Sequence, residues 1–103
     1  MVCLSVFSFL SSQGVATQSN LTITDTVVDE TGQPFPGVVI YLNEAYQYAT
    51  FTDFDGNFSL QLPMVLIRYT LVFSFIDYHD ATFSFLPNQV PRNMFVAMQP
   101  NEL

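Results

Sequence analysis

Residues 52–62, TDFDGNFSLQL, decide the fold because a tight turn is followed at once by a strand with strict two-residue alternation. The Asp, Asn and Gly residues of the first half are turn formers, and Gly56 is the natural place for a positive φ. In the second half, apolar residues alternate with Ser59 and Gln61. This pattern predicts a strand with one buried face, which ends at Pro63.

The same alternation of short strands and turns continues in both directions along the chain. Besides residues 58–62, strands are predicted at residues 21–29, 38–42, 47–52, 71–76, 81–85 and 94–98. About seven strands with turns every 8–12 residues are typical of an all-β, antiparallel sandwich. The segment 71–76, LVFSFI, is the most apolar and is predicted to be the central strand.

The alternation also predicts the core and leaves little room for helices. The apolar residues expected to be largely buried are Ile40, Leu42, Phe58, Leu60, Leu62, Leu71, Phe73 and Phe75. The best helical candidate, residues 43–48, is too short, and residues 64–69 are interpreted as the lead-in to the central strand.

Length and composition limit the classes of function. A chain of 103 residues forms one domain, and half of its residues are hydrophobic, which excludes a disordered protein. The chain has no lysine, only Arg68 and Arg92 as basic residues, and a net charge of −7. Binding to nucleic acid is therefore excluded, because it requires several cationic side chains, and binding to anionic membranes is disfavoured for the same reason.

The inventory of reactive side chains predicts no active site, no metal site and no cofactor. The single Cys3 and single His79 cannot form a disulfide or a zinc cluster. Only carboxylates and hydroxyls remain, and carboxylate catalysis needs two acids that converge in a cleft. The acids Asp29, Glu30, Asp53, Asp55, Asp77 and Asp80 all lie in or beside predicted turns. Because the turns of a sandwich lie at two opposite ends, only a subset of these acids is expected to meet.

Four motifs are candidate functional sites. The Asp53, Asp55 and Asn57 spacing fails the calcium-loop pattern, because Gly56 is fourth rather than sixth, and it predicts a capped turn instead. The segment 77–80, DYHD, lacks a nucleophile and is interpreted as an exposed polar turn.

Arg68 is expected to pair with an acid or to lie at a sheet edge, with binding of an acidic ligand as the alternative. Most aromatic residues recur at the two-residue spacing of strands and are therefore expected to lie in the core. An exposed subset, such as Tyr41, Tyr46 and Tyr48, is the candidate contact with a glycan or a protein partner.

Residues 1–20 are predicted to be a signal peptide or leader, with the folded domain at residues 21–103. The apolar run 2–10, VCLSVFSFL, is too short to span a bilayer, and it is followed by small polar residues that allow cleavage after Ala16. No basic residue precedes the run. An N-terminal β-strand is the alternative interpretation.

Three segments carry a resemblance to the carboxypeptidase-regulatory-like domain. Residues 27–38, VVDETGQPFPGV, resemble the family's opening pattern V-x-D-x-x-G-x-P-L-P-G-V; residues 52–58, TDFDGNF, match T-D-x-[DE]-G-x-[FY]; and residues 71–78, LVFSFIDY, resemble L-x-F-S-[YF]-[IV]-G-Y. They occur in the family's order and cover about residues 21–100. Asp25 and Asp77 stand where the family usually has Gly. Asp77 is a mild change in a turn, whereas Asp25 in a strand is expected to be exposed or to cost stability.

The resemblance implies a transthyretin-like (prealbumin-like), seven-stranded Greek-key β-sandwich without enzymatic activity. Many such domains follow the signal peptide of SusC/RagA-type TonB-dependent outer-membrane receptors. The implied function is a periplasmic accessory module of a glycan or nutrient receptor, either a fragment or a freestanding copy. The implied partner is the receptor's plug and barrel or another envelope protein, with no membrane span of its own.

Two alternative functions stay open. One is a secreted or surface sandwich that binds carbohydrate or protein by itself. The other is the regulatory lobe of a carboxypeptidase, which needs a zinc-ligand motif upstream of the domain. The leader predicted at residues 1–20 disfavours the second alternative.

Overall fold

The computed structural model describes residues 20–91 and 94–101. Within them the chain forms seven strands: β1 (Asn20–Val28), β2 (Val39–Leu42), β3 (Ala45–Phe51), β4 (Asn57–Pro63), β5 (Tyr69–Ser74), β6 (Ala81–Phe85) and β7 (Phe95–Ala97). Each predicted strand is present. The described residues contain no helix, and the helical candidate 43–48 is a two-residue turn followed by the start of β3. The predicted leader lies outside the described residues.

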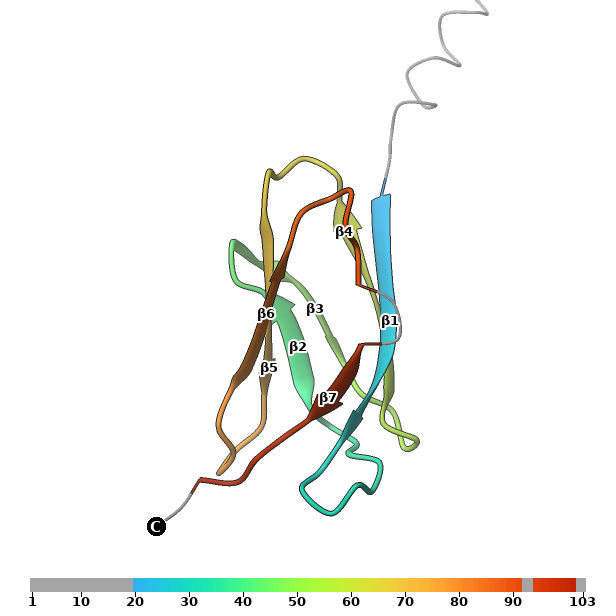
Figure 1. The fold of residues 1–103 in the computed structure, drawn as a ribbon, viewed down its shortest axis with the longest axis vertical. Helices are drawn as coiled ribbons and strands as arrows, with labels where there is room; N and C mark the ends of the chain where they lie inside the picture. Colours follow the sequence, from blue (N-terminus) through green and yellow to red (C-terminus); the bar gives the residue numbers. More distant parts are fainter. Residues whose placement is uncertain (1–19, 92–93, 102–103) are drawn as a thin grey trace, which may run out of the picture.

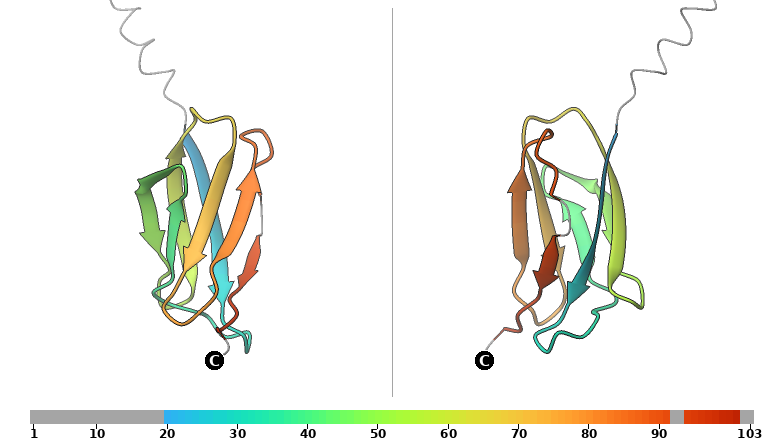
Figure 2. Two further views of the ribbon diagram at one scale, coloured as in Figure 1. Left: turned by 90° about the vertical axis from the view of Figure 1, so that its left-hand side faces the viewer. Right: turned by 45° about the vertical axis from the view of Figure 1, so that its right-hand side comes forward.

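The strands form two sheets packed face to face (Figures 1 and 2). One sheet has the order β4-β1-β7 and the other the order β3-β2-β5-β6. Strand β5 returns to lie beside β2 after the chain has passed through β3 and β4, and β3 contacts β4 where the two sheets meet. This arrangement of β2 to β5 is a Greek key, as expected.

One strand pair departs from the antiparallel expectation. Strands β1 and β7 pair in parallel, with Thr26 opposite Phe95 and Val28 opposite Ala97, whereas the other four pairs are antiparallel. The reason is geometric. Each successive strand reverses direction, so two odd-numbered strands run the same way, and β7 fills the free edge of β1 rather than pairing with an even-numbered strand.

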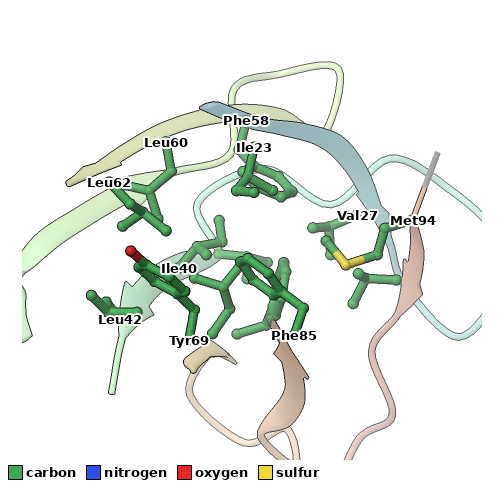
Figure 3. Packing of buried hydrophobic residues seen from close by; sticks show 14 of the residues in the cluster. Ile23, Val27, Ile40, Leu42, Phe58, Leu60, Leu62, Tyr69, Phe85 and Met94 are labelled. Carbon is green, nitrogen blue, oxygen red and sulfur yellow. The ribbon is translucent and has the colours of Figure 1, made fainter. Parts of the chain in front are cut away.

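The core lies between the two sheets (Figure 3). Ile23, Phe58 and Leu60 point from one sheet toward Ile40, Tyr69 and Phe85 of the other. Seven of the eight residues predicted to be largely buried are at most 5% exposed: Ile40, Leu42, Phe58, Leu60, Leu62, Leu71 and Phe73. The most apolar strand, β5, lies between β2 and β6, so it is an interior strand of its sheet, as predicted.

Phe75 and Tyr69 differ from the expectation in opposite directions. Phe75 was predicted to be core, but β5 ends at Ser74 and Phe75 is only half-buried in the following turn. Tyr69, which was assigned to the lead-in, is completely buried. Its hydroxyl donates to the carbonyl oxygen of Pro63 at 2.6 Å and accepts from the amide of Leu66 at 3.1 Å, so it closes the β4–β5 connection.

Because each strand runs opposite to the one before it, connections that follow odd-numbered strands lie at one end of the sandwich and those that follow even-numbered strands lie at the other. The β1–β2, β3–β4 and β5–β6 connections lie at the same end, which also carries the C-terminal residues 98–101 (Figure 1). The β2–β3 and β4–β5 connections lie at the opposite end. All three turns singled out in the sequence therefore meet at one end.

Candidate functional site

Two of the three turns at this end have the same internal structure. In residues 29–33, DETGQ, Asp29 Oδ1 accepts the backbone amides of Thr31 at 2.9 Å and Gln33 at 3.0 Å. In residues 53–57, DFDGN, Asp53 Oδ1 accepts the amides of Asp55 and Asn57, each at 2.9 Å. In both turns the amide of the glycine donates to the aspartate carbonyl oxygen, and the glycine has a positive φ, +86° or +77°.

These hydrogen bonds explain the role of the two aspartates. Asp53 is a turn residue whose carboxylate caps backbone amides, as the sequence predicted. The side-chain hydrogen bond from Thr31, with the amide bonds, holds the pKa of Asp29 below its ordinary value. The hydrogen bonds that close the turn therefore favour the charged form of the Asp29 carboxylate.

The third turn follows β5. Asp77 has φ +68°, a left-handed conformation that aspartate tolerates. It stands at the position where the family pattern usually has glycine. His79 is exposed, and its backbone amide donates to the Gln99 carbonyl oxygen at 2.9 Å. The Tyr78 hydroxyl donates to Glu30 Oε1 at 2.7 Å, which raises the pKa of Tyr78 and links this turn to the β1–β2 connection.

The three turns place six acids at one end of the molecule: Asp29, Glu30, Asp53, Asp55, Asp77 and Asp80. We call this the acidic end. Contrary to expectation, these three turns do not divide between the two ends, because each follows an odd-numbered strand, whereas Glu44 lies in the β2–β3 turn at the opposite end. The acids are nevertheless spread around the end. Across residues 20–91 and 94–101, no three Asp, Glu, His or Cys side chains come close enough to hold a metal ion.

A shallow apolar hollow of about 550 Å³ opens at the acidic end between the β1–β2, β3–β4 and β5–β6 connections. Its lining consists of Pro36, Gly37, Thr52, Asp53, Phe54 and Phe75. Phe75, half-buried in one wall, packs against Phe35 with ring centroids 4.6 Å apart, and Tyr78 completes this aromatic cluster. Phe54 is 91% exposed at the tip of its turn. The half-burial of Phe75 therefore reflects its place in the wall of this hollow.

Thr52 holds the floor of the hollow in place. It is 5% exposed, and its hydroxyl donates to the Phe35 carbonyl oxygen at 2.6 Å while it accepts from the Val38 amide at 2.9 Å. Sequence reasoning missed this role. The available signals were the position of Thr52 directly before the DFDGN turn and its place as the first residue of the pattern T-D-x-[DE]-G-x-[FY].

A second exposed aromatic site lies on the outer face of β2 and β3. Tyr41 and Tyr46 meet edge to face, with centroids 5.5 Å apart, and line a hollow of about 350 Å³ with Val39 and Ala49. Tyr48, the third predicted member, points the other way and packs against the core. Because the two rings are perpendicular, they offer one stacking face at a time rather than a flat platform.

The remaining candidates lie apart from both sites. Arg68 is exposed in the β4–β5 connection at the end opposite the acidic end. Asp25 lies in β1 opposite Phe58; its Oδ1 accepts the Thr26 amide at 3.0 Å, while its Oδ2 is buried without a hydrogen-bond partner in the described part of the chain. An unpaired buried carboxylate oxygen is generally destabilising, and the stability cost of Asp25 stays a prediction.

Comparison with known proteins identifies one family. The model of the carboxypeptidase regulatory-like domain matches residues 22–99, which is nearly the whole sandwich from β1 to the segment after β7. A search of curated proteins gives no match. None of the residues that the structure describes belongs to a helix long and apolar enough to cross a membrane.

Proposed function

Because the chain belongs to the carboxypeptidase regulatory-like domain family, we propose that it is a non-catalytic interaction module of the bacterial cell envelope. In this proposal it sits on the periplasmic side of the outer membrane, as the N-terminal accessory domain of a TonB-linked nutrient receptor or as a freestanding copy of one. The observation that carries the proposal is the extent of the family match, which coincides with the folded sandwich itself.

Two features of the acidic end support a binding role over a catalytic one. The carboxylates of Asp29 and Asp53 each accept hydrogen bonds from two backbone amides of their own turns. They stabilise these turns. The hollow between the turns is shallow and lined mainly by apolar groups, as in a surface that recognises another protein. Domains of this family are typically non-catalytic, which agrees with this arrangement.

Site-directed labelling tests the location. Ser59 is exposed on β4, and Cys3 lies in the predicted leader, so Ser59→Cys introduces a single thiol into the domain. In intact cells we expect a membrane-impermeant maleimide to label this variant only after the outer membrane is permeabilised. The unsubstituted chain is the control and stays unlabelled if the leader is removed. Labelling of Ser59→Cys in intact cells contradicts a periplasmic location and favours the cell surface.

The coding sequence beyond Leu103 tests the receptor context independently. A plug and a barrel encoded in frame support the accessory-domain form of the proposal. A stop codon supports the freestanding form.

The Tyr41–Tyr46 pair favours a second candidate function, a secreted or surface sandwich that binds carbohydrate. One exposed ring can stack on one pyranose, and the neighbouring hollow can hold part of it. A glycan panel that raises the melting temperature of the wild-type protein, but not of Tyr46→Ala, supports this function. An unchanged melting temperature across the panel argues against it.

A further inference from the structure

We propose that the apolar hollow at the acidic end is a docking site for a cationic segment of a partner protein, which inserts one large apolar side chain between Phe54 and Phe75. This inference rests on the proposed role as an interaction module and names the surface and the chemistry of the partner. The hollow, the exposed phenylalanine and the surrounding charge each limit what can bind there.

The first argument is the presence of a rigidly presented aromatic residue. Phe54 is 91% exposed, yet it lies in a turn that Asp53 closes with two hydrogen bonds of 2.9 Å to the amides of Asp55 and Asn57. A large apolar side chain on a preorganised turn loses little conformational freedom when a partner covers it. Such a residue beside a hollow has the form of a binding hot spot.

The second argument is the shape and make-up of the hollow. Gly37 lies in its wall with φ +81°, a backbone conformation that favours glycine, and its position beside Phe75 brings the β1–β2 connection into the hollow. Pro36 and Phe75 provide the apolar surface. The hollow, of about 550 Å³, is open to solvent, so a partner can lay one Leu, Met, Phe or Trp side chain against its lining.

The third argument is charge complementarity. Asp53 lines the hollow, and Asp29, Glu30, Asp55, Asp77 and Asp80 lie in the same three connections that contribute its lining, whereas Arg68 lies at the other end of the sandwich. A cluster of one sign attracts a partner of the opposite sign and orients it before contact. The occupant that fits is therefore rich in Lys or Arg around its apolar side chain.

The charge also argues against two other occupants. A second copy of this chain would bring an identical acidic end and a net charge of −7, so the two would repel each other. An anionic lipid surface would be repelled for the same reason. Neither a second copy nor an anionic lipid surface carries the positive charges that would pair with the six acids.

The test uses the purified full chain and a panel of fluorescein-labelled 12-residue peptides. Each peptide has several Lys and Arg residues around one variable position, which is Phe, Trp, Leu, Met or Ser, and matched peptides carry Glu in place of the basic residues. Fluorescence anisotropy measures affinity, and amide chemical shifts from NMR locate the bound peptide.

We expect at least one apolar, cationic peptide to bind about tenfold or more tightly than its Ser counterpart, and the Glu peptides not to bind. The largest amide shifts should fall on Gly37, Asp53 and Phe54. Phe54→Ser should weaken binding about tenfold, and Asp55→Asn with Asp80→Asn should weaken it further and reduce its dependence on salt. Ile67→Ser is the matched control, since Ile67 is 85% exposed at the opposite end.

Three results overturn the inference: no peptide of the panel shifts the amides of the hollow, the Ser peptides bind as tightly as the apolar ones, or Phe54→Ser binds like the wild type. Each of these can occur while the labelled Ser59→Cys variant remains periplasmic. Conversely, specific peptide binding with labelling in intact cells contradicts the proposed location and leaves the docking surface intact.

Discussion

The backbone of Gly56 lies directly against the backbone of Val27. The Val27 amide donates to the Gly56 carbonyl oxygen at 2.7 Å, and a Cβ built on Gly56 would lie 2.5 Å from the Val27 carbonyl oxygen. This contact joins the β3–β4 turn to the end of β1. Glycine is therefore required at position 56 both for its positive φ and for the closeness of the neighbouring chain.

Gly56→Ala should destabilise the domain strongly. The left-handed conformation alone costs an alanine about 1–2 kcal/mol, and the backbone contact with Val27 must also be relieved. Gly32→Ala is the matched control, because Gly32 has φ +86° in the equivalent turn with no atom within 4 Å of the added Cβ. Urea unfolding should show a larger loss of the free energy of unfolding for Gly56→Ala, by about 1 kcal/mol or more. Equal losses would show that the contact with Val27 is not a constraint.

Thr52→Val should destabilise the domain by about 1–3 kcal/mol, because it leaves the Val38 amide and the Phe35 carbonyl oxygen buried without their partner. Thr52→Ser keeps the hydroxyl and should lose clearly less. Thermal unfolding of both variants measures the difference. If Thr52→Val unfolds like Thr52→Ser, the hydroxyl does not stabilise this connection.

Phe73→Ala should cost about 3–5 kcal/mol of unfolding free energy, because it empties a fully buried position. The Phe73 ring meets Phe58 of the opposite sheet edge to face at 5.5 Å and Phe83 of β6 at 5.6 Å. Phe54→Ala, at a 91% exposed position, is the control and should stay within about 0.5 kcal/mol of the wild type. A near-wild-type midpoint for Phe73→Ala would contradict the assignment of β5 as the core of the four-stranded sheet.

The lowered pKa of Asp29 predicts a pH dependence of stability with a definite sign. The folded carboxylate holds its proton less tightly than the unfolded one, so its stabilising contribution is present above the ordinary pKa of about 4 and is lost as the pH falls through the lowered folded value. Asp29→Asn should therefore lose less stability than the wild type as the pH falls below the ordinary carboxyl pKa of about 4.

Asp55→Asn is the charge-matched control for this measurement, since the structure gives its carboxylate no hydrogen bond comparable to that of Asp29 with Thr31. Its acid-induced loss of stability should follow the wild type more closely than Asp29→Asn does. If both variants change the pH profile equally, general repulsion at the acidic end, rather than the Thr31 hydrogen bond, is responsible.

Local sequence was enough to predict the strands and the turns. Two-residue alternation identified the buried rows of β2 and β4, and the residues 53–57 identified a capped turn with a positive φ at Gly56. These features depend on neighbours within a few positions, where side-chain direction and backbone preference are set by adjacent residues. The family resemblance then supplied the Greek-key arrangement, which alternation alone does not specify.

Tertiary structure alone decided how these parts meet. The parallel pairing of β1 with β7, the burial of Tyr69 against the Pro63 carbonyl oxygen, and the placement of six acids at the same end as the hollow beside Phe54 all join residues far apart or on different elements. The physical reason is that a local pattern shows which face of a strand is apolar, but not which strand will cover it. Only the closing of the two sheets over one core determines which turns share an end, and therefore where charge and exposed apolar surface come together.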